Sequence, residues 1–249
     1  MAKLLIPLPN TDFDPTEVAV PWQILRTRGH EIVFATPDGG AASADPIMVS
    51  GQGLGLLAGM LRADANGCAA HAALLGDTAF QRPLTYDALQ PGDFAGLILP
   101  GGHAAGVRTY LESTRLQGFV AAMFAQDRPV GAICHGTLVA ARSRDARGRS
   151  VLYGRRTTAL TAQMELSAWW LTRAWMGDYY RTYPETVQAE VTRALARPGD
   201  FEVGPVSFRR DKPERLDLGL VVRDGNYLSA RWPGDAHRFA EAFAALLTP

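Results

Sequence analysis

The sequence predicts an α/β fold with a mostly parallel sheet, and three observations indicate this class. Near the N-terminus, a strand pattern, a well-capped helix pattern and a second strand pattern follow one another, as in a βαβ unit. Two more apolar strand patterns, at 94–99 and 129–133, each precede a helical pattern. The length of 249 residues is enough to bury a large core in one domain.

The first helix has the clearest start signal in the chain. Asp14 at the N-cap, Pro15 at the first helical position and Glu17 at the third form a strong initiation pattern, and Gly29 ends the helix. The segments 3–8 and 31–36, before and after it, have the composition of buried strands. The opening of the chain is therefore a parallel βαβ unit.

The remaining elements are less sharply marked. Residues 41–90 are rich in Ala, Gly and Leu, and we expect them to form a lid inserted beside the sheet of a single domain, 1–249. The other expected elements are helices around 68–75, 116–124, 137–142, 164–175 and 186–195, a strand at 155–160, a hairpin of 216–222 with 227–230 around Asp224-Gly225, and a last helix capped by Asp235.

Composition excludes several functional classes. The chain has 25 basic and 25 acidic residues, and this neutral balance argues against a nucleic-acid partner. No apolar run approaches the roughly 20 residues that span a bilayer, so we expect no membrane segment. A chain with this much core does not need a disulfide between Cys68 and Cys134, and we expect a cytoplasmic protein with reduced thiols.

Cys134 lies at the most informative position of the sequence. The strand pattern 129–133 runs directly into Cys134-His135-Gly136 and then into a helix, with the small residues Ala132 and Gly136 two positions away on either side. This is typical of a nucleophile elbow, where the turn is tight and strained. A helix N-terminus favours the thiolate, so we interpret Cys134 as a reactive thiol and not as a small buried hydrophobe.

His135 and Glu17 are candidate partners of this thiol. His135 follows Cys134 directly and is either a catalytic group or an exposed residue at a helix start. Glu17 is explained equally well by a capping box and by catalysis, because the first strand delivers it to the same sheet edge as Cys134. The residues alone leave both interpretations of Glu17 open.

Gly101, Gly102 and His103 follow the strand at 94–99 and reach the same edge. A Gly pair lets backbone N–H groups approach a substrate oxyanion, although a turn that needs positive φ is the alternative. His103 has no other His at a metal-binding spacing, so we expect neither a metal nor another cofactor.

Four motifs together resemble the ThiJ/PfpI superfamily, the class I glutamine amidotransferase-like proteins. They are Asp-Pro-Thr-Glu17, Leu-Pro-Gly-Gly-His103, Ala-Ile-Cys134-His135-Gly and Asp-Gly-Asn-Tyr-Leu228, in family order. The branch with glyoxalase III and holding chaperones is the most similar. The resemblance implies a flavodoxin-like three-layer α/β sandwich and a homodimer.

Carried over to this sequence, the resemblance implies Cys134 as nucleophile, Glu17 as the acid beside it and His135 as its partner. It implies an oxyanion site from Gly102 and the Cys134–His135 backbone. A third acid that orients His135 is expected about 30 residues after the Cys in some members, and Glu165 is the nearest candidate.

The sequence departs from the family pattern in two places. Ala230-Arg231-Trp232-Pro233 stands where relatives often have Gly-Gln-Asn-Pro, which predicts a different pocket rim. The segment 169–183 is heavily aromatic, and core packing or a subunit interface explains it better than substrate binding. His237 lacks the following Glu that glutamine hydrolysis requires, so we disfavour that activity.

These residues predict a cysteine-dependent enzyme acting on a small-molecule carbonyl compound. The leading hypothesis is a glyoxalase III-like lyase that converts 2-oxoaldehydes to 2-hydroxy acids without a cofactor. One alternative is an amidase or peptidase that forms an acyl-enzyme on the same Cys134. Another is a non-catalytic holding chaperone or oxidative-stress sensor, with Cys134 as a redox-sensitive thiol.

Overall fold

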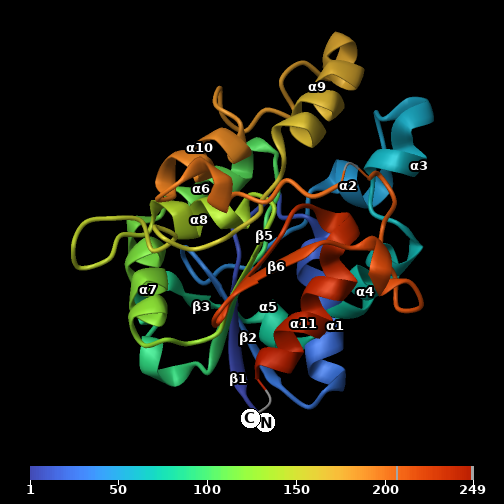
Figure 1. Ribbon diagram of the computed structural model, residues 1–249. Helices are drawn as coiled ribbons and strands as arrows, with labels where there is room; N and C mark the ends of the chain where they lie inside the picture. The colour runs from blue at the N-terminus through green and yellow to red at the C-terminus, as the bar shows by residue number, and fades with distance from the viewer. Residues whose placement is uncertain (206, 248–249) are drawn as a thin grey trace.

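Seven strands form one sheet in the order β3-β2-β1-β4-β5-β7-β6, and only β6 runs antiparallel to its neighbour (Figure 1). The computed structural model describes residues 1–205 and 207–247, so the last two residues of the predicted domain lie outside them. The strands are β1 Lys3–Pro7, β2 Glu31–Thr36, β3 Leu84–Thr85, β4 Gly96–Leu99, β5 Val130–Ile133, β6 Val221–Asp224 and β7 Tyr227–Ala230.

Helices cover both faces of the sheet and make three layers (Figure 1). One face packs against α1 Pro15–Thr27, α4 Ala65–Leu74, α5 Thr78–Gln81 and α11 Ala236–Leu246. The other face packs against α6 Arg108–Leu111, α7 Thr114–Ala125, α8 Gly136–Arg142 and α10 Val187–Ala194. Among the described residues, no helix has the length and apolar character needed to cross a membrane.

The order of the strands determines where a site can form. β1 pairs with β2 on one side and with β4 on the other, so the chain changes direction across the sheet at β1. The loops after β1 and β4 therefore diverge and leave a crevice at the carboxyl ends of the strands, where open α/β sheets bind ligands. β5, which precedes Cys134, pairs directly with β4.

Three sequence-based predictions about the C-terminal half are wrong. Residues 155–160 form no strand, and Thr157 makes only an isolated bridge to Phe201. The strand predicted at 216–222 begins at Val221, because Leu216–Leu218 form a 3-10 turn. The side chain of Asp235 does not cap α11, because its carboxylate accepts hydrogen bonds from Leu220 N and from Arg231 instead.

The segment expected as a lid, 41–90, divides into two parts with different packing. Its second half, with α4 and α5, packs against α1 and β2 and belongs to the body of the fold. Its first half, with α2 Pro46–Ser50 and α3 Ala58–Leu61, packs instead against α9 Ala162–Met176 and the residues after it. Only this first half lies over the sheet edge near Cys134.

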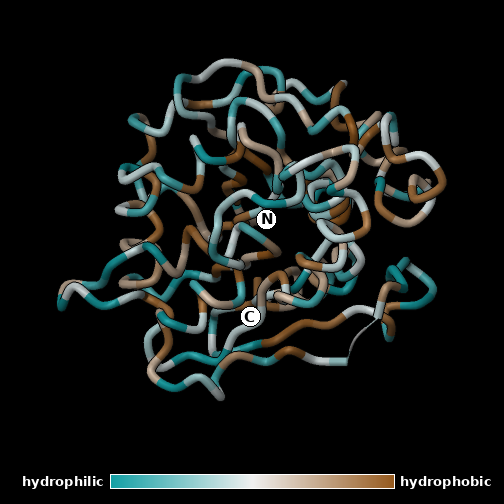
Figure 2. Tube along the Cα trace, turned by 90° about the horizontal axis from the view of Figure 1, so that it is seen from above, coloured by the Kyte–Doolittle hydropathy of each residue, from teal (hydrophilic) through white to brown (hydrophobic). Residues whose placement is uncertain are grey.

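Some apolar side chains stay exposed in these outer segments. Seen from above, hydrophobic stretches lie at the periphery of the molecule as well as in its interior (Figure 2). On α9, Trp170, Leu171 and Trp175 are all exposed, and Leu56 before α3 is fully exposed. These outer segments therefore add exposed apolar surface to the molecule without extending its core.

Candidate active site

Cys134 occupies a strained turn between β5 and α8. Its φ is +57°, a left-handed conformation that non-glycine residues rarely adopt. Gly136 makes this turn sterically feasible, because a Cβ at that position would lie 2.0 Å from the Leu99 carbonyl oxygen. The sulfur is thus presented at the carboxyl edge of the sheet, with 6% of the residue exposed and facing a pocket.

Glu17 is delivered to the same place by the first turn of α1. Asp14 caps this helix alone, since its carboxylate accepts hydrogen bonds from Thr16 N (2.8 Å) and Glu17 N (3.0 Å). The Asp14 N–H donates to the Gly101 carbonyl, so Glu17 has no capping role. Its Oε2 accepts the Gly101 N–H at 2.7 Å, and its Oε1 is buried without a partner.

The electrostatics of this pair differ from the expectation of an ionised thiol. Burial raises the pKa of the Cys134 thiol well above its ordinary value, and the charges of Glu17 and Asp14 raise it further. Burial also raises the pKa of Glu17, and the charge of Asp14 adds to this. The His135 N–H at the start of α8 lowers the thiol pKa, but burial outweighs it.

His135 is fully buried, with both ring nitrogens engaged. Nδ1 lies 3.4 Å from Cys134 Sγ, and Nε2 lies 3.0 Å from the Thr182 hydroxyl. That hydroxyl donates its only proton to the His103 carbonyl at 2.6 Å, so it accepts from His135 Nε2–H. Burial, together with the charges of His103 and Arg142, lowers the His135 pKa to about 3, so the ring is neutral with a lone pair on Nδ1 facing the sulfur.

The prediction that Glu165 orients His135 does not match this geometry. Glu165 accepts a hydrogen bond from Val187 N (2.9 Å) and lies 3.8 Å from Arg181, so its carboxylate caps the start of α10. Thr182 takes the place foreseen for the acid, and Arg108 holds it there by donating to its carbonyl. Thr182 lies in an irregular loop where no periodicity or spacing could have singled it out.

Backbone donors for a substrate oxygen are fewer than the resemblance implies. The Cys134 N–H continues the sheet by donating to the Ala230 carbonyl, and the Gly101 N–H is taken by Glu17. The His135 N–H is directed at the sulfur. Gly102 lines the pocket, and its N–H has no acceptor among the described residues, so this group is available to a substrate.

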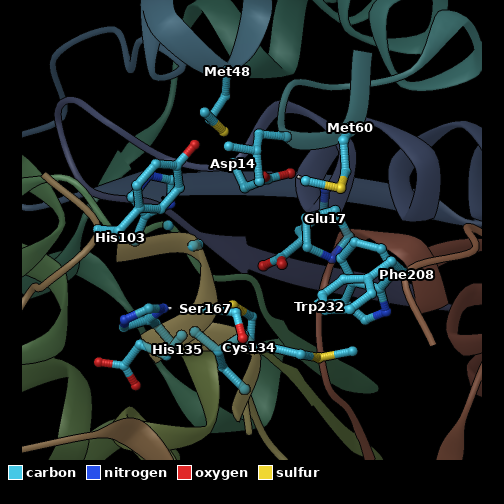
Figure 3. A pocket seen from close by; sticks show the side chains of 18 of the residues that line it. Asp14, Glu17, Met48, Met60, His103, Cys134, His135, Ser167, Phe208 and Trp232 are labelled. Carbon is cyan, nitrogen blue, oxygen red and sulfur yellow. Dashed lines mark hydrogen bonds between the residues drawn. The ribbon is translucent and has the colours of Figure 1, made fainter. Parts of the chain in front are cut away.

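The pocket has a volume of about 180 Å³ and combines the catalytic candidates with a mainly apolar wall (Figure 3). Glu17, Cys134, His135, Gly102 and His103 border it, as does Glu165. The apolar wall comes from the segment 46–61, from α9 and from the loop around residue 208. Its residues include Met48, Met60, Leu61, Met164, Ala168, Leu171 and Phe208. The His103 ring stacks on Tyr180 with the centroids 4.5 Å apart, which fixes one side of the cavity.

The aromatic segment 169–183 therefore has several roles. Tyr180 lines the pocket, whereas Trp170 and Trp175 are exposed to solvent. Tyr183 packs under the guanidinium of Arg142, 4.6 Å from the ring centroid, and away from the cavity. Of the aromatic residues in this segment, only Tyr180 borders the pocket.

The unusual Arg231-Trp232 sequence builds the opposite rim. Arg231 is fully buried, where it forms a two-pronged ion pair with Asp235 (2.9 and 3.0 Å) and donates to the Pro205 carbonyl at 2.7 Å. Trp232 follows it and lines the pocket beside Phe208 (Figure 3). In the part of the chain that the structure describes, no group of three or more His, Cys, Asp or Glu could hold a metal ion.

Known proteins are similar to this chain over much of its length. Deglycase PfpI from Pyrococcus furiosus is 23% identical over 240 residues, covering 96% of each chain. A deglycase from Thermococcus kodakarensis is 26% identical over 164 residues, covering 66% of this chain and 69% of its own.

Solved structures share the fold at low sequence identity. Rapid Encystment Protein 24 KDa from Francisella tularensis matches with a TM-score of 0.72 at 17% identity and covers both chains completely. Glyoxalase III from Candida albicans matches with a TM-score of 0.66 at 17% identity, over 98% of this chain and 97% of its own. The predicted flavodoxin-like three-layer fold is thereby confirmed.

Residues 8–195, more than half of the chain, match the family described as ThiJ/PfpI family-like. The chain belongs to the ThiJ/PfpI family.

Proposed function

We propose that this chain is a cysteine-dependent enzyme that converts 2-oxoaldehydes into 2-hydroxy acids without a redox cofactor. The observation that carries the proposal is the juxtaposition of Cys134, Glu17 and His135 at one pocket. Glu17 Oε1 is buried without a partner, and His135 Nδ1 faces the sulfur. A buried acid with an unused oxygen beside a nucleophile is the arrangement that proton transfer during carbonyl addition requires.

The reaction begins with addition of the thiol to the aldehyde carbon. The Cys134 sulfur forms a bond to this carbon, the carbonyl electron pair moves to oxygen, and the thiol proton ends on that oxygen, giving a hemithioacetal. Removal of the C1 proton gives an enediolate. Return of that proton to C2, with movement of the C1 hydroxyl proton to the C2 oxygen, gives a thioester of a 2-hydroxy acid. Water then cleaves the C–S bond and restores the thiol, so the oxidation of C1 balances the reduction of C2.

Glu17 and His135 suit different steps of this reaction. Glu17, whose pKa is raised well above its ordinary value by burial, can both accept and return a proton, which a carboxylate of ordinary pKa does poorly. His135, with a pKa of about 3, is a weak base, and its role is to accept the S–H hydrogen bond and orient the thiol. The Gly102 N–H is the donor that would stabilise the oxygen formed on addition.

A second candidate activity is the removal of carbonyl adducts from amines. Its support is that relatives in the comparison, from Pyrococcus furiosus and Thermococcus kodakarensis, are named deglycases. The same thiol would displace the amine from the carbon that carries it, the amine would leave with a proton from Glu17, and the product would be the same hemithioacetal. The proton transfer from C1 to C2 described above would then give the thioester, which water cleaves to the 2-hydroxy acid.

The test follows methylglyoxal consumption and lactate formation with the wild type, Cys134→Ser, Glu17→Gln and the control Cys68→Ser. Cys68 lies outside the pocket, so its variant should retain wild-type turnover. We expect Cys134→Ser to abolish turnover and Glu17→Gln to reduce it by about 10²-fold or more. Undiminished turnover in Cys134→Ser would sink the proposal. Lactate release from a methylglyoxal–amine adduct, with free methylglyoxal untouched, would favour the second candidate.

A further inference from the structure

The pocket wall contains polar hydrogens that the protein itself leaves unused. Arg210 Nη1, Trp232 Nε1 and the Tyr180 hydroxyl are buried, and none has a hydrogen-bond partner. Tyr180 and Trp232 are each more than nine-tenths buried, and all three residues line the cavity that holds Cys134. A buried donor without an acceptor costs roughly 1–3 kcal/mol, so a ligand that supplies acceptors would recover this energy.

Arg210 is held in place by its other contacts. Its Nη2 donates to the Arg62 carbonyl at 2.8 Å and to the Met60 carbonyl at 3.4 Å, at the end of α3. Its guanidinium lies over the Trp232 ring, 5.1 Å from the centroid. The side chain is therefore fixed with Nη1 as its remaining buried donor, and it needs no rearrangement to bind an acceptor.

No carboxylate of the site satisfies Arg210. Arg210 lowers the pKa values of Asp14 and Glu17, so its charge reaches both groups. However, Asp14 uses its Oδ1 on the N-terminal turn of α1, and in the described chain the hydrogen bonds of Arg210 go to backbone carbonyls and not to either acid. His103 and His135 have lowered pKa values, which leaves Arg210 as the cation among the described lining residues.

We propose that Arg210 and Trp232 bind a carboxylate of the substrate, so that the preferred substrate is an acid-bearing carbonyl compound and not a neutral one such as methylglyoxal. This inference rests on the proposed function for its reacting carbon, but not for its anion site. The guanidinium matches the single charge of a carboxylate, and its free Nη1 and the free Trp232 Nε1 would supply one donor for each carboxylate oxygen. The apolar residues Met60, Leu61 and Phe208 nearby would contact a short hydrocarbon spacer.

Binding without turnover tests the anion site directly. The probes are 4-methyl-2-oxopentanoate and its uncharged amide, and their dissociation constants are measured by ligand-observed NMR on the Cys134→Ala variant. We expect the acid to bind at least about tenfold more tightly than the amide. Adding Arg210→Gln should remove this preference, and Arg210→Lys should keep part of it. The neighbouring, exposed Arg209→Gln is the matched control and should change nothing.

A second variant guards against a folding defect in Arg210→Gln. Trp232→Phe removes the indole N–H while retaining an aromatic ring, and it should weaken the acid several-fold while leaving the amide unaffected. Equal affinities for acid and amide in the protein with Arg210 intact would overturn the inference. So would an unchanged preference in both the Arg210→Gln and Trp232→Phe proteins.

Labelling of the thiol separates this inference from the proposed function. N-propylmaleimide and 3-maleimidopropionate differ only in the acid, and their rates are compared at Cys134 by peptide mass, with Cys68 as the internal control. In the wild type, 3-maleimidopropionate should react faster than N-propylmaleimide at Cys134, with each rate divided by the rate at Cys68. This preference for the acidic reagent should fall about tenfold in Arg210→Gln. If neither maleimide labels Cys134, the prediction of a reactive thiol is wrong. The proposed anion site is then still tested by the dissociation constants from NMR.

Discussion

The Thr182 hydroxyl fixes the tautomer of His135. Because this hydroxyl donates to the His103 carbonyl at 2.6 Å, it can only accept from His135 Nε2, 3.0 Å away. The proton of the neutral ring is thereby placed on Nε2, and the Nδ1 lone pair faces Cys134 Sγ. A neutral hydroxyl orients the ring where a carboxylate was expected, and it does so without stabilising the imidazolium.

Thr182→Val should release this constraint while conserving shape. The variant leaves His135 Nε2–H without an acceptor, and we expect kcat for methylglyoxal to fall about 10-fold or more with little change in KM. The ¹⁵N chemical shifts of the His135 ring should report a single Nε2–H tautomer in the wild type and a mixture in the variant. Thr182→Ser should restore both readouts, and a pure Nε2–H tautomer in Thr182→Val would contradict the assignment.

Glu17→Gln should change the pH profile of alkylation at Cys134. The Glu17 charge is one cause of the raised thiol pKa, so ionisation of Glu17 should add a step to the pH profile of iodoacetamide labelling. Replacing the carboxyl by an amide removes that charge, which removes this step and moves the thiol titration to lower pH, while the Asp14 charge continues to act on the thiol. A thiol step that stays in place, or moves to higher pH, would show that Glu17 does not act on the sulfur.

The same substitution should stabilise the fold in a pH-dependent manner. The pKa of Glu17 is raised above its ordinary value of 4.5, so its contribution is fully present below pH 4.5 and is lost as pH rises through the folded-state pKa. Glu17→Gln stays neutral, so its melting temperature should exceed the wild-type value increasingly above pH 4.5. At pH 8 we expect a gain of at least about 1 kcal/mol, or roughly 2–4 °C.

The control for this stability measurement is Glu214→Gln, the same substitution at an exposed position outside the pocket. A constant offset between Glu17→Gln and the wild type from pH 4 to pH 8 would mean that Glu17 titrates normally in the folded protein.

Gly136→Ala should strongly destabilise the protein, because its Cβ would lie 2.0 Å from a backbone oxygen of Leu99. We expect a loss of about 3 kcal/mol or more in the free energy of unfolding, measured by denaturant titration. Gly118, inside α7, has open space around the position of a Cβ, and Gly118→Ala should stabilise by about 0.5–1 kcal/mol. Similar effects from the two substitutions would contradict the close approach of α8 to β4.

Local patterns predicted the elements that position Cys134 and Glu17. The cap at Asp14 and the apolar segments at 3–8, 31–36 and 129–133 each depend on neighbours in sequence, and the structure has strands and a helix at these places. The sequence also predicted that Glu17 and the loop after β4 lie at the same edge of the sheet, because parallel strands deliver their following loops to one edge.

Features that depend on long-range partners could not be predicted. Residues 155–160 have a strand composition, but no sheet edge reaches them, so they stay irregular. Asp235 has the type and position of a helix cap, yet Arg231 takes its carboxylate. Thr182 and Arg210 lie in loops, and only the folded chain shows that one contacts His135 and the other reaches the pocket.

The buried Arg231–Asp235 pair fixes an outer loop of the pocket to the central sheet. Arg231 ties the carbonyl of Pro205 to the end of β7, so this strand of the central sheet also anchors the loop carrying Phe208 and Arg210. Cys134 and Glu17 lie at the sheet edge, at the starts of α8 and α1, whereas Phe208 and Arg210 of the pocket wall lie on the loop that Arg231 tethers. Substitutions in this loop can therefore reshape the pocket wall without displacing Cys134 or Glu17.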